Sequence, residues 1–449
     1  MPAARRNPPL AWVALVAALA LDAVSAYRAT VQPASDVRTY RQWINGPLPS
    51  WDLPGPYPVG ADLLWWPLRW VHGSLVESNL WWLACCTVPV TLVACLVLWR
   101  TAFRPVLAMT VWLVAAGLLE RSYWMRMEPV AALGALLMIV AVRRGRRGVV
   151  GAGGGAGGGP VRSWRVAASA LALSAGSLIK VWPVFLAPTA VLVLAGRAGR
   201  ARWTAPLRWL GWFVLPWAAY GAAVLALRPA HPFTWFTFTL GRRTQVEAVA
   251  ALPALWGMAA GSKSWTIRKL GGLDSTDVVL GPHLHAPRYA LQGIGVVLLV
   301  LLAVRVGRWR LATPDRDGTP DRSALGVVLC TQVAMLIVII FAGPVFSPQY
   351  LVWFAAPFAV AVGEGLLARE SVVWLVGCGA TFLEFPTLWL DLERGDPLAI
   401  GVLTARDAVL VALLVLCLVR LRRDTAPRRL PAGPGAGVPS RSGAPGGAG

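Results

Sequence analysis

Charged residues are scarce in this sequence, and acidic residues are the scarcest of them. Only 14% of the 449 residues are charged, with 21 Asp and Glu against 42 Lys and Arg, whereas 57% are hydrophobic. The apolar residues gather into long runs and do not follow the amphipathic spacing of a globular protein. Because such runs are stable only in lipid, the composition excludes a soluble domain and indicates an integral membrane protein.

The sequence also lacks the spacings of cysteine and histidine that indicate disulfides or metal sites. The six cysteines all lie in apolar runs, which excludes a disulfide framework and favours small buried side chains. The four histidines form no HExxH or comparable ligand spacing, so we expect no metal and no cofactor. These residues are Cys85, Cys86, Cys95, Cys330, Cys378 and Cys417, with His72, His231, His283 and His285.

Long apolar runs are abundant. A membrane crossing needs about 20 mainly apolar residues, and runs of nearly that length recur along the chain. The sequence therefore predicts an all-α bundle of about twelve transmembrane helices, of which three short ones, 105–119, 128–142 and 166–179, are the weakest. The predicted spans are 9–29, 79–99, 105–119, 128–142, 166–179, 182–196, 206–228, 289–304, 324–342, 351–368, 371–390 and 398–419.

The basic residues decide between nucleic-acid binding and membrane orientation as the origin of the +21 net charge. If the N-terminus is cytoplasmic, the inner segments hold 26 of the 42 Lys and Arg but 5 of the 21 Asp and Glu. Positive-inside orientation accounts for the whole excess, so we expect no nucleic-acid partner. The chain is predicted to be a multi-pass cell-membrane protein with both termini cytoplasmic, and residues 1–26 to be an uncleaved first helix.

The chain divides into one membrane domain, residues 1–423, and a Pro- and Gly-rich tail, 424–449, which is predicted to be disordered. The outer loops are 30–78 and 229–288, and each contains a candidate outward-facing interfacial helix, at 61–75 and 231–258. A flexible glycine-rich cytoplasmic loop, 148–160, lacks the Lys-Ser/Thr ending of a phosphate-binding loop. We find no internal repeat, which counts against a transporter.

Asp36 is the first carboxylate beyond the first span, and it is followed by Arg38, Tyr40 and Arg41. A carboxylate held at the membrane surface can deprotonate a hydroxyl for attack on a lipid-linked substrate. The alternative is a solvated loop residue or an ion-pair partner of Arg38.

Two further segments carry candidate phosphate ligands. In the second outer loop, Arg242 and Arg243 are followed by Gln245 and Glu247, and guanidinium groups bind phosphate oxygens in pairs. Lys180 ends an apolar run, where an ammonium is either a phosphate counter-ion or a group that reaches toward the interface.

Other polar positions have structural explanations. Ser347-Pro348-Gln349-Tyr350 forms a turn that is either a ligand contact or only a tight connection. A balanced ion-pair cluster is expected in the turn that holds Glu120, Arg121, Arg126 and Glu128. For the carboxylates inside spans, pairing between helices is expected, for example of Asp407 with a nearby arginine; these are Asp22, Glu364, Glu384 and Asp407.

Taken in order, these segments resemble glycosyltransferase family 87 of the GT-C superfamily, the polyprenyl-phosphate-mannose-dependent mannosyltransferases of actinobacteria. The resemblance covers most of residues 10–420. Its motifs are Asp36 with Tyr40 and Tyr57-Pro58, Gly176–Pro183 with Lys180 before an aromatic and Pro, the Arg-x-Gln-x-Glu element Arg243–Glu247, and Ser347–Trp353. The chain has Val59 and Met125–Pro129 where many members carry a second Pro and a Gly-Gln-x-Asn element.

The resemblance implies an inverting transfer of a hexose, with mannose expected, from a polyprenyl-phosphate donor to a glycolipid or glycan hydroxyl on the outer face. Asp36 would be the general base, and Lys180 and Arg243 would offset the charge of the leaving phosphate. Sugar or acceptor would be oriented by Tyr40, Gln245, Glu247 and Gln349, with Arg242 and Tyr350 beside them. Arabinose or glucose as the sugar, and a transporter or scaffold without chemistry, stay open.

Overall fold

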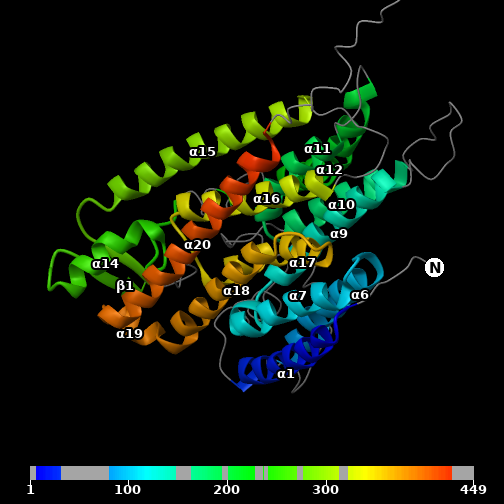
Figure 1. Cartoon of the computed structure of the whole chain (residues 1–449). Helices are drawn as coiled ribbons and strands as arrows, with labels where there is room; N and C mark the ends of the chain where they lie inside the picture. Colours follow the sequence, from blue (N-terminus) through cyan, green and yellow to red (C-terminus); the bar gives the residue numbers. More distant parts are fainter. Residues whose placement is uncertain are drawn as a thin grey trace, which may run out of the picture.

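The computed structural model describes residues 7–31, 80–147, 163–194, 201–227, 236, 241–269, 277–312 and 322–426. Its described part is almost entirely helical (Figure 1). Six helices are long and apolar enough to cross a membrane, as expected for a multi-pass membrane protein. They are Pro9–Val31, Leu83–Thr101, Trp203–Ala226, His285–Arg310, Ala324–Ala342 and Pro397–Asp424.

Shorter helices complete the bundle, and many adjoin 3₁₀ or π turns. The bounds of the helices are α1 Pro9–Val31, α5 Leu80–Trp82, α6 Val88–Thr101, α7 Pro105–Leu119, α8 Arg121–Trp124, α9 Glu128–Arg147, α10 Ser163–Ile179, α11 Ala187–Leu194, α12 Ala201–Leu227, α14 Leu252–Ala259, α15 His285–Ala312, α16 Arg322–Ala342, α17 Ala355–Gly363, α18 Ala368–Phe382, α19 Trp389–Glu393 and α20 Pro397–Asp424. The turns next to them are η3 Leu83–Thr87, η4 Trp182–Leu186, η5 Val249–Ala251, η6 Pro348–Phe354 and η7 Leu383–Thr387.

Where its residues are described, each of the twelve predicted spans coincides with helical structure, but within the described part of the chain six helices are long and apolar enough to cross a membrane. The segment 371–390, for example, is interrupted within η7, where Phe385 leaves the helical conformation beside Pro386. Proline interrupts a helix because it has no N–H and its ring clashes with the preceding turn. Twelve crossings therefore stay a prediction.

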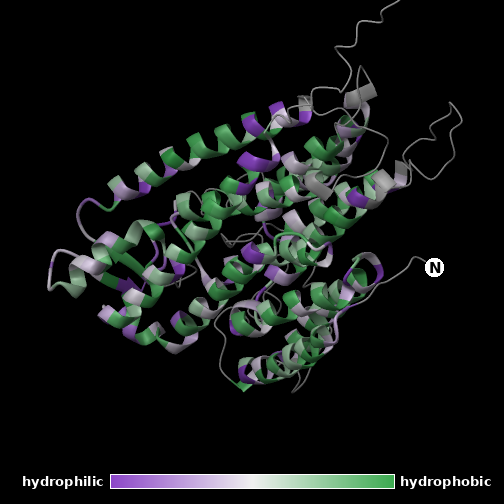
Figure 2. Ribbon diagram, viewed as in Figure 1, coloured by the Kyte–Doolittle hydropathy of each residue, from purple (hydrophilic) through white to green (hydrophobic). Residues whose placement is uncertain are grey.

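The helices form an inner and an outer set. Most residues of α7 are buried, and so are 72% of the residues in the apolar stretch of α16. In the apolar stretches of α12 and α15, only 17% of the residues are buried. Large apolar side chains such as Ile294 and Val300 point outward from α15, and Figure 2 shows hydrophobic residues along this outlying helix. An outer surface of this kind requires lipid as its solvent.

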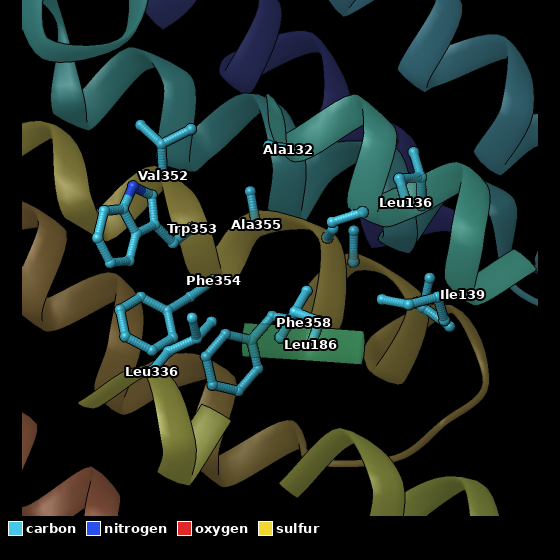
Figure 3. Close-up of a cluster of buried hydrophobic side chains, with 14 of the residues drawn as sticks. Ala132, Leu136, Ile139, Leu186, Leu336, Val352, Trp353, Phe354, Ala355 and Phe358 are labelled. Carbon is cyan, nitrogen blue, oxygen red and sulfur yellow. The ribbon is translucent and has the colours of Figure 1, made fainter. Parts of the chain in front are cut away.

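The centre of the core lies where α9, α16 and α17 meet. Leu136 and Ile139 of α9 lie near Leu336 of α16 and near Phe354 and Phe358, which come from the η6 and α17 segment (Figure 3). All five side chains are at most 5% exposed. Close packing holds these helices together, because lipid tails are as apolar as the side chains and association gains nothing from the hydrophobic effect.

The second outer loop departs from the sequence prediction. We expected an interfacial helix over 231–258, but 241–248 is irregular and helix returns only at η5 and α14. The chain then forms two antiparallel strands, β1 Thr266–Lys269 and β2 Asp277–Leu280, which no sequence pattern had suggested. Pro253 lies in the first turn of α14, where its missing N–H has no cost, so it starts this helix instead of interrupting one. The other expected interfacial helix, 61–75, lies outside the described residues.

Candidate functional site

The hairpin of α9 and α10 brings two of the charged residues together. Gly134 of α9 and Gly176 of α10 face each other so closely that a Cβ on Gly134 would lie 2.7 Å from the carbonyl oxygen of Ala172. This packing aligns the start of α9 with the end of α10. As a result, the Lys180 Nζ lies 2.9 Å from Glu128 Oε1, and Glu128 is fully buried. As the first residue of α9, Glu128 is also stabilised by the helix dipole.

Residues 241–248 lie against the same end of the bundle, where backbone hydrogen bonds hold them. The Gln245 N–H donates to Pro344 O at 2.9 Å, and the Val246 N–H donates to Asp277 O of β2 at 3.0 Å. The guanidinium of Arg288 donates to the carbonyl of Arg242 at 3.1 Å. The irregular conformation is therefore fixed by three neighbouring segments, which explains why helical periodicity did not predict it.

Six side chains from these segments form what we call the polar cluster: Arg126, Glu128, Lys180, Arg242, Glu247 and Tyr350. Electrostatic interactions link its members. The pKa of the Lys180 ammonium lies below its usual value, mainly because of burial. The positive charges of Arg126 and Arg242 also lower this pKa, whereas the carboxylate of Glu128 opposes the shift. The cluster thus brings together three basic side chains at one end of the bundle. They come from three interhelical segments: Arg126 lies before α9, Lys180 after α10, and Arg242 between α12 and η5.

Glu247 contributes little negative charge to this cluster at neutral pH. Its side chain is 5% exposed. Burial, together with the nearby carboxylate of Glu384, raises the pKa of the Glu247 carboxyl to about 8. The cluster holds three basic side chains against only two carboxyl groups, those of Glu128 and Glu247, so its residues carry more positive than negative charge. Such a site stabilises an anion that enters it.

Two amide oxygens provide the hydrogen-bonding part of the site. Gln245 is 3% exposed and Gln349 is 6% exposed, and the Oε1 of each has no hydrogen-bond partner among the described residues. A buried acceptor without a donor is costly, so such a group in a native protein points to a ligand, water or chain segment that supplies one. Sugar hydroxyls are donors of this kind.

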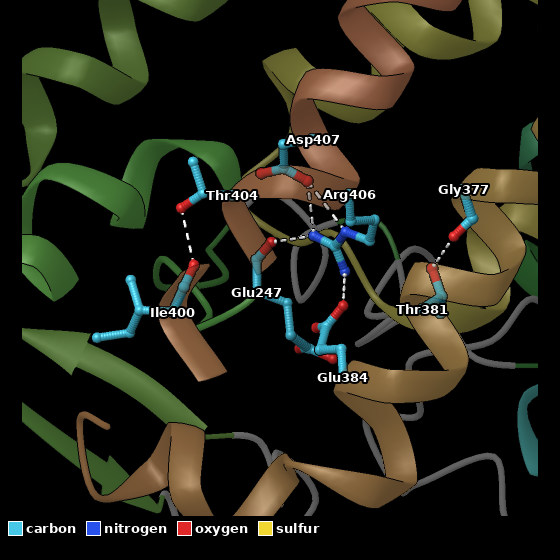
Figure 4. Close-up of polar contacts among 8 residues, drawn as sticks. All are labelled: Glu247, Gly377, Thr381, Glu384, Ile400, Thr404, Arg406 and Asp407. Atoms are coloured by element: carbon cyan, nitrogen blue, oxygen red, sulfur yellow. Dashed lines mark hydrogen bonds and ion pairs between the residues drawn. The ribbon is translucent and has the colours of Figure 1, made fainter. Parts of the chain in front are cut away.

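A second network supports the cluster from α20 (Figure 4). Arg406 is fully buried and lies 2.6 Å from Glu384 and 2.9 Å from Asp407, measured between nitrogen and oxygen. The same guanidinium donates to the carbonyl oxygen of Glu247 at 2.9 Å and covers the ring of Phe346. Arg406 therefore fixes the backbone of Glu247 relative to α20 and η7.

The predicted site residues divide into four groups. Lys180, Arg242, Glu247 and Tyr350 lie in the polar cluster, and the segments that hold Gln245 and Gln349 are joined by the bond from Gln245 to Pro344. Arg243 is exposed. Asp36 and Tyr40 lie outside the described residues.

Arg126 and Glu128 were not predicted as site residues, because the turn that holds them was interpreted as a closed ion-pair cluster. The charges of this turn do interact with one another, Glu128 with Arg126 and Glu120 with Arg121. Both carboxylates also make close ion pairs outside the turn: Glu128 with Lys180, and Glu120 with Arg28 at 3.2 Å. In the sequence, a glutamate at the start of one apolar helix and a lysine at the end of the next would have been the signal for this pair.

Two of the four in-span carboxylates, those of Glu364 and Glu384, follow the predicted pairing between helices, and two do not. Glu364 pairs with Arg143 at 2.6 Å, and Glu384 and Asp407 both pair with Arg406. The pair of Asp407 lies within one helix and does not join two. Asp22 has no hydrogen-bond partner among the described residues, although it is 5% exposed.

Among the described residues, no three His, Cys, Asp or Glu side chains come together as metal ligands would. Comparison of the chain with protein-family models, with curated proteins and with solved structures finds no match.

Proposed function

We propose that the protein is a membrane glycosyltransferase that moves a hexose, with mannose as the expected sugar, from a polyprenyl-phosphate donor to a hydroxyl of a glycolipid or glycan. The observation that carries this proposal is the polar cluster, a net positive and largely buried site at the end of an apolar bundle. A lipid-linked phosphate combines the anion that such a site favours with a chain that stays in the membrane.

The reaction has one bond formed and one broken. The acceptor oxygen bonds to C1 of the hexose as the bond from C1 to the phosphate oxygen breaks, with inversion at C1. The electron pair leaves with the polyprenyl phosphate, where Lys180, Arg126 and Arg242 offset the added charge. The acceptor proton passes to the base, for which we propose Asp36 from its sequence position and the family resemblance.

Gln245 and Gln349 complete the proposed site. Their partnerless Oε1 atoms accept hydrogen bonds from hydroxyls of the sugar or the acceptor. Tyr350 and the protonated Glu247 are donors next to the cations. A site with cations for a phosphate and neutral hydrogen-bonding groups for a sugar suits a phosphosugar better than a plain phospholipid.

The orientation supports a lipid-linked donor and not a nucleotide sugar. We propose that the bundle crosses the membrane twelve times with both termini in the cytoplasm, because its basic residues concentrate in the segments that the positive-inside rule then assigns to the cytoplasm. The polar cluster then faces outward in the cell membrane, away from the nucleotide sugars of the cytoplasm.

The test is direct. Purified protein in lipid is incubated with radiolabelled polyprenyl-phosphate-mannose and a membrane extract, and the labelled product is identified. Transfer that needs both the protein and the extract supports the proposal. If the donor binds but no sugar is transferred, the transporter alternative holds. The incubation is repeated with the arabinose- and glucose-linked donors, and transfer from one of these alone would identify that sugar, and not mannose, as the one transferred.

A further inference from the structure

A cavity lies in the half of the bundle away from the polar cluster. It has a volume of about 70 Å³, opens to the exterior, and is enclosed by α9, α11, α15 and α16. Its walls are mostly apolar, with Ile139, Val193 and Val328 among them. This volume is roughly half that of an apolar cavity of about 150 Å³ that holds benzene, so it admits only part of a larger ligand.

Two buried arginines line this apolar cavity. Arg143 is 8% exposed and Arg310 is 6% exposed. Arg143 pairs with Glu364, which also lines the cavity, and the Nε of Arg310 donates to the carbonyl of Leu192 at 3.2 Å. The ionisable groups of the lining therefore carry one more positive than negative charge.

The surroundings of the cavity are basic as well. Arg305 of α15 donates to the carbonyl of Arg422 of α20, so the positively charged ends of these two helices lie together. A basic site between helices, next to the membrane surface, has the charge that attracts an anionic lipid headgroup. Guanidinium groups are also well shaped for phosphate oxygens.

A third feature shows that the cavity has a place for a polar ligand group. Gln332 lines it and is 1% exposed, and its Nε2 donates to Thr189 Oγ1 at 2.8 Å. Its Oε1 has no hydrogen-bond partner among the described residues. This oxygen requires a donor, which a lipid hydroxyl or a water enclosed with the lipid supplies.

We propose that this cavity binds one anionic phospholipid. The phosphate faces Arg143 and Arg310, and the hydrocarbon covers the apolar walls and continues along the exposed apolar side chains of α15. The site is separate from the polar cluster, and it does not depend on the proposed transfer reaction.

The full chain in neutral detergent is titrated with phosphatidylglycerol, with phosphatidylcholine or with inorganic phosphate, and bound lipid is counted by native mass spectrometry. We expect one phosphatidylglycerol to be retained at least about tenfold more tightly than phosphatidylcholine. Equal retention of the two lipids would overturn the proposal. If inorganic phosphate at millimolar concentration displaces phosphatidylglycerol from the protein, the site binds a free anion, and the proposal is overturned.

Variants locate the bound lipid. Arg310→Gln should lower phosphatidylglycerol affinity about tenfold, whereas Arg308→Gln, which removes an exposed charge two residues away on the same helix, should leave it unchanged. Val193→Phe fills the cavity without changing charge and should reduce retention of the lipid. Equal losses from Arg308→Gln and Arg310→Gln would mean only general attraction to a basic surface and would contradict the proposed site.

Discussion

At the scale of single residues, the pairing of Lys180 with Glu128 determines what the cluster can bind. A lysine balanced by one carboxylate adds no net charge, so attraction for a phosphate depends on the two arginines next to the pair. Arg242 and Arg243 therefore differ, although they are neighbours in the sequence: Arg242 interacts with the cluster, and Arg243 is exposed.

This difference gives a first prediction. Lys180→Met and Arg242→Gln should each lower transfer from the lipid-linked donor by about ten- to a hundredfold, because one charge-assisted contact contributes about 1.5 to 3 kcal/mol. Arg243→Gln should have a smaller effect. Steady-state rates with varied donor measure this, with exposed Lys263→Gln as the charge control. Normal donor KM and kcat in the Lys180 and Arg242 variants would place the phosphate elsewhere.

A second prediction concerns Asp36. Asp36→Asn keeps the size of the side chain but cannot take a proton, so a base role predicts a loss of about 10² to 10⁴ in rate with donor binding nearly intact. A residue that only pairs with Arg38 would show lower stability at near-normal turnover. Thermal stability and turnover of the purified variant separate these cases, and a stable, fully active variant would eliminate Asp36 as the base.

A third prediction follows from the raised pKa of Glu247, which is about 8 in the folded protein against 4.5 in an unfolded chain. Between these values the folded state keeps a proton that the unfolded state releases. Stability contributed by this group therefore falls as pH rises, by about 1.4 kcal/mol per pH unit, and levels off above pH 8. Glu247→Gln should remove this slope.

The measurement for Glu247 is the melting temperature of wild type and variant in detergent between pH 6 and pH 9. The melting temperature of Glu247→Gln minus that of the wild type should increase with pH up to about pH 8 and then stay constant. Comparison of the two proteins cancels the titration of other groups, and Arg406 keeps its contact because it binds the backbone oxygen. A difference that does not change with pH would show that Glu247 is ionised throughout.

At the scale of elements, the α9 and α10 hairpin sets the position of the site. Close contact at Gly134 and Gly176 leaves no room for a side chain, and this contact aligns Glu128 with Lys180. Small residues allow this approach in membrane helices because two backbones meet directly.

The fourth prediction tests this contact. Gly134→Ala should destabilise the protein by about 1 to 3 kcal/mol and lower transfer, because its Cβ would meet a backbone oxygen that cannot move alone. Gly211→Ala in α12 is the matched control: nothing lies within 4 Å of its added Cβ, and alanine favours helix. Equal thermal stability of both variants would show that the hairpin tolerates a wider separation.

At the scale of the whole molecule, orientation decides which substrates reach the polar cluster. The fifth prediction is that single cysteines at positions 50 and 264 of a cysteine-free variant react with an impermeant thiol reagent on intact cells, whereas one at position 163 does not. The positions hold Ser50, Ser163 and Ser264. Labelling at position 163 alone would reverse the orientation and turn the polar cluster toward the cytoplasm.

The sequence by itself determined the class of protein and the position of most helices. Hydrophobic runs and basic flanks are local properties, so each predicted span coincided with helical structure where its residues are described. It also identified Lys180, because an ionisable residue beside an apolar run is conspicuous. Arg242 and Glu247 were identified as part of a cluster of basic, amide and acidic side chains in the second predicted outer loop.

Only the tertiary structure decided which of these groups meet. The pair of Glu128 with Lys180 depends on helix packing between residues 52 positions apart, and Arg406 reaches Glu247 across 159 positions. The irregular segment 241–248 is held by hydrogen bonds to β2, to Arg288 of α15 and to the turn after α16. Periodicity describes only neighbours along the chain, so it cannot specify contacts between segments that are distant in sequence.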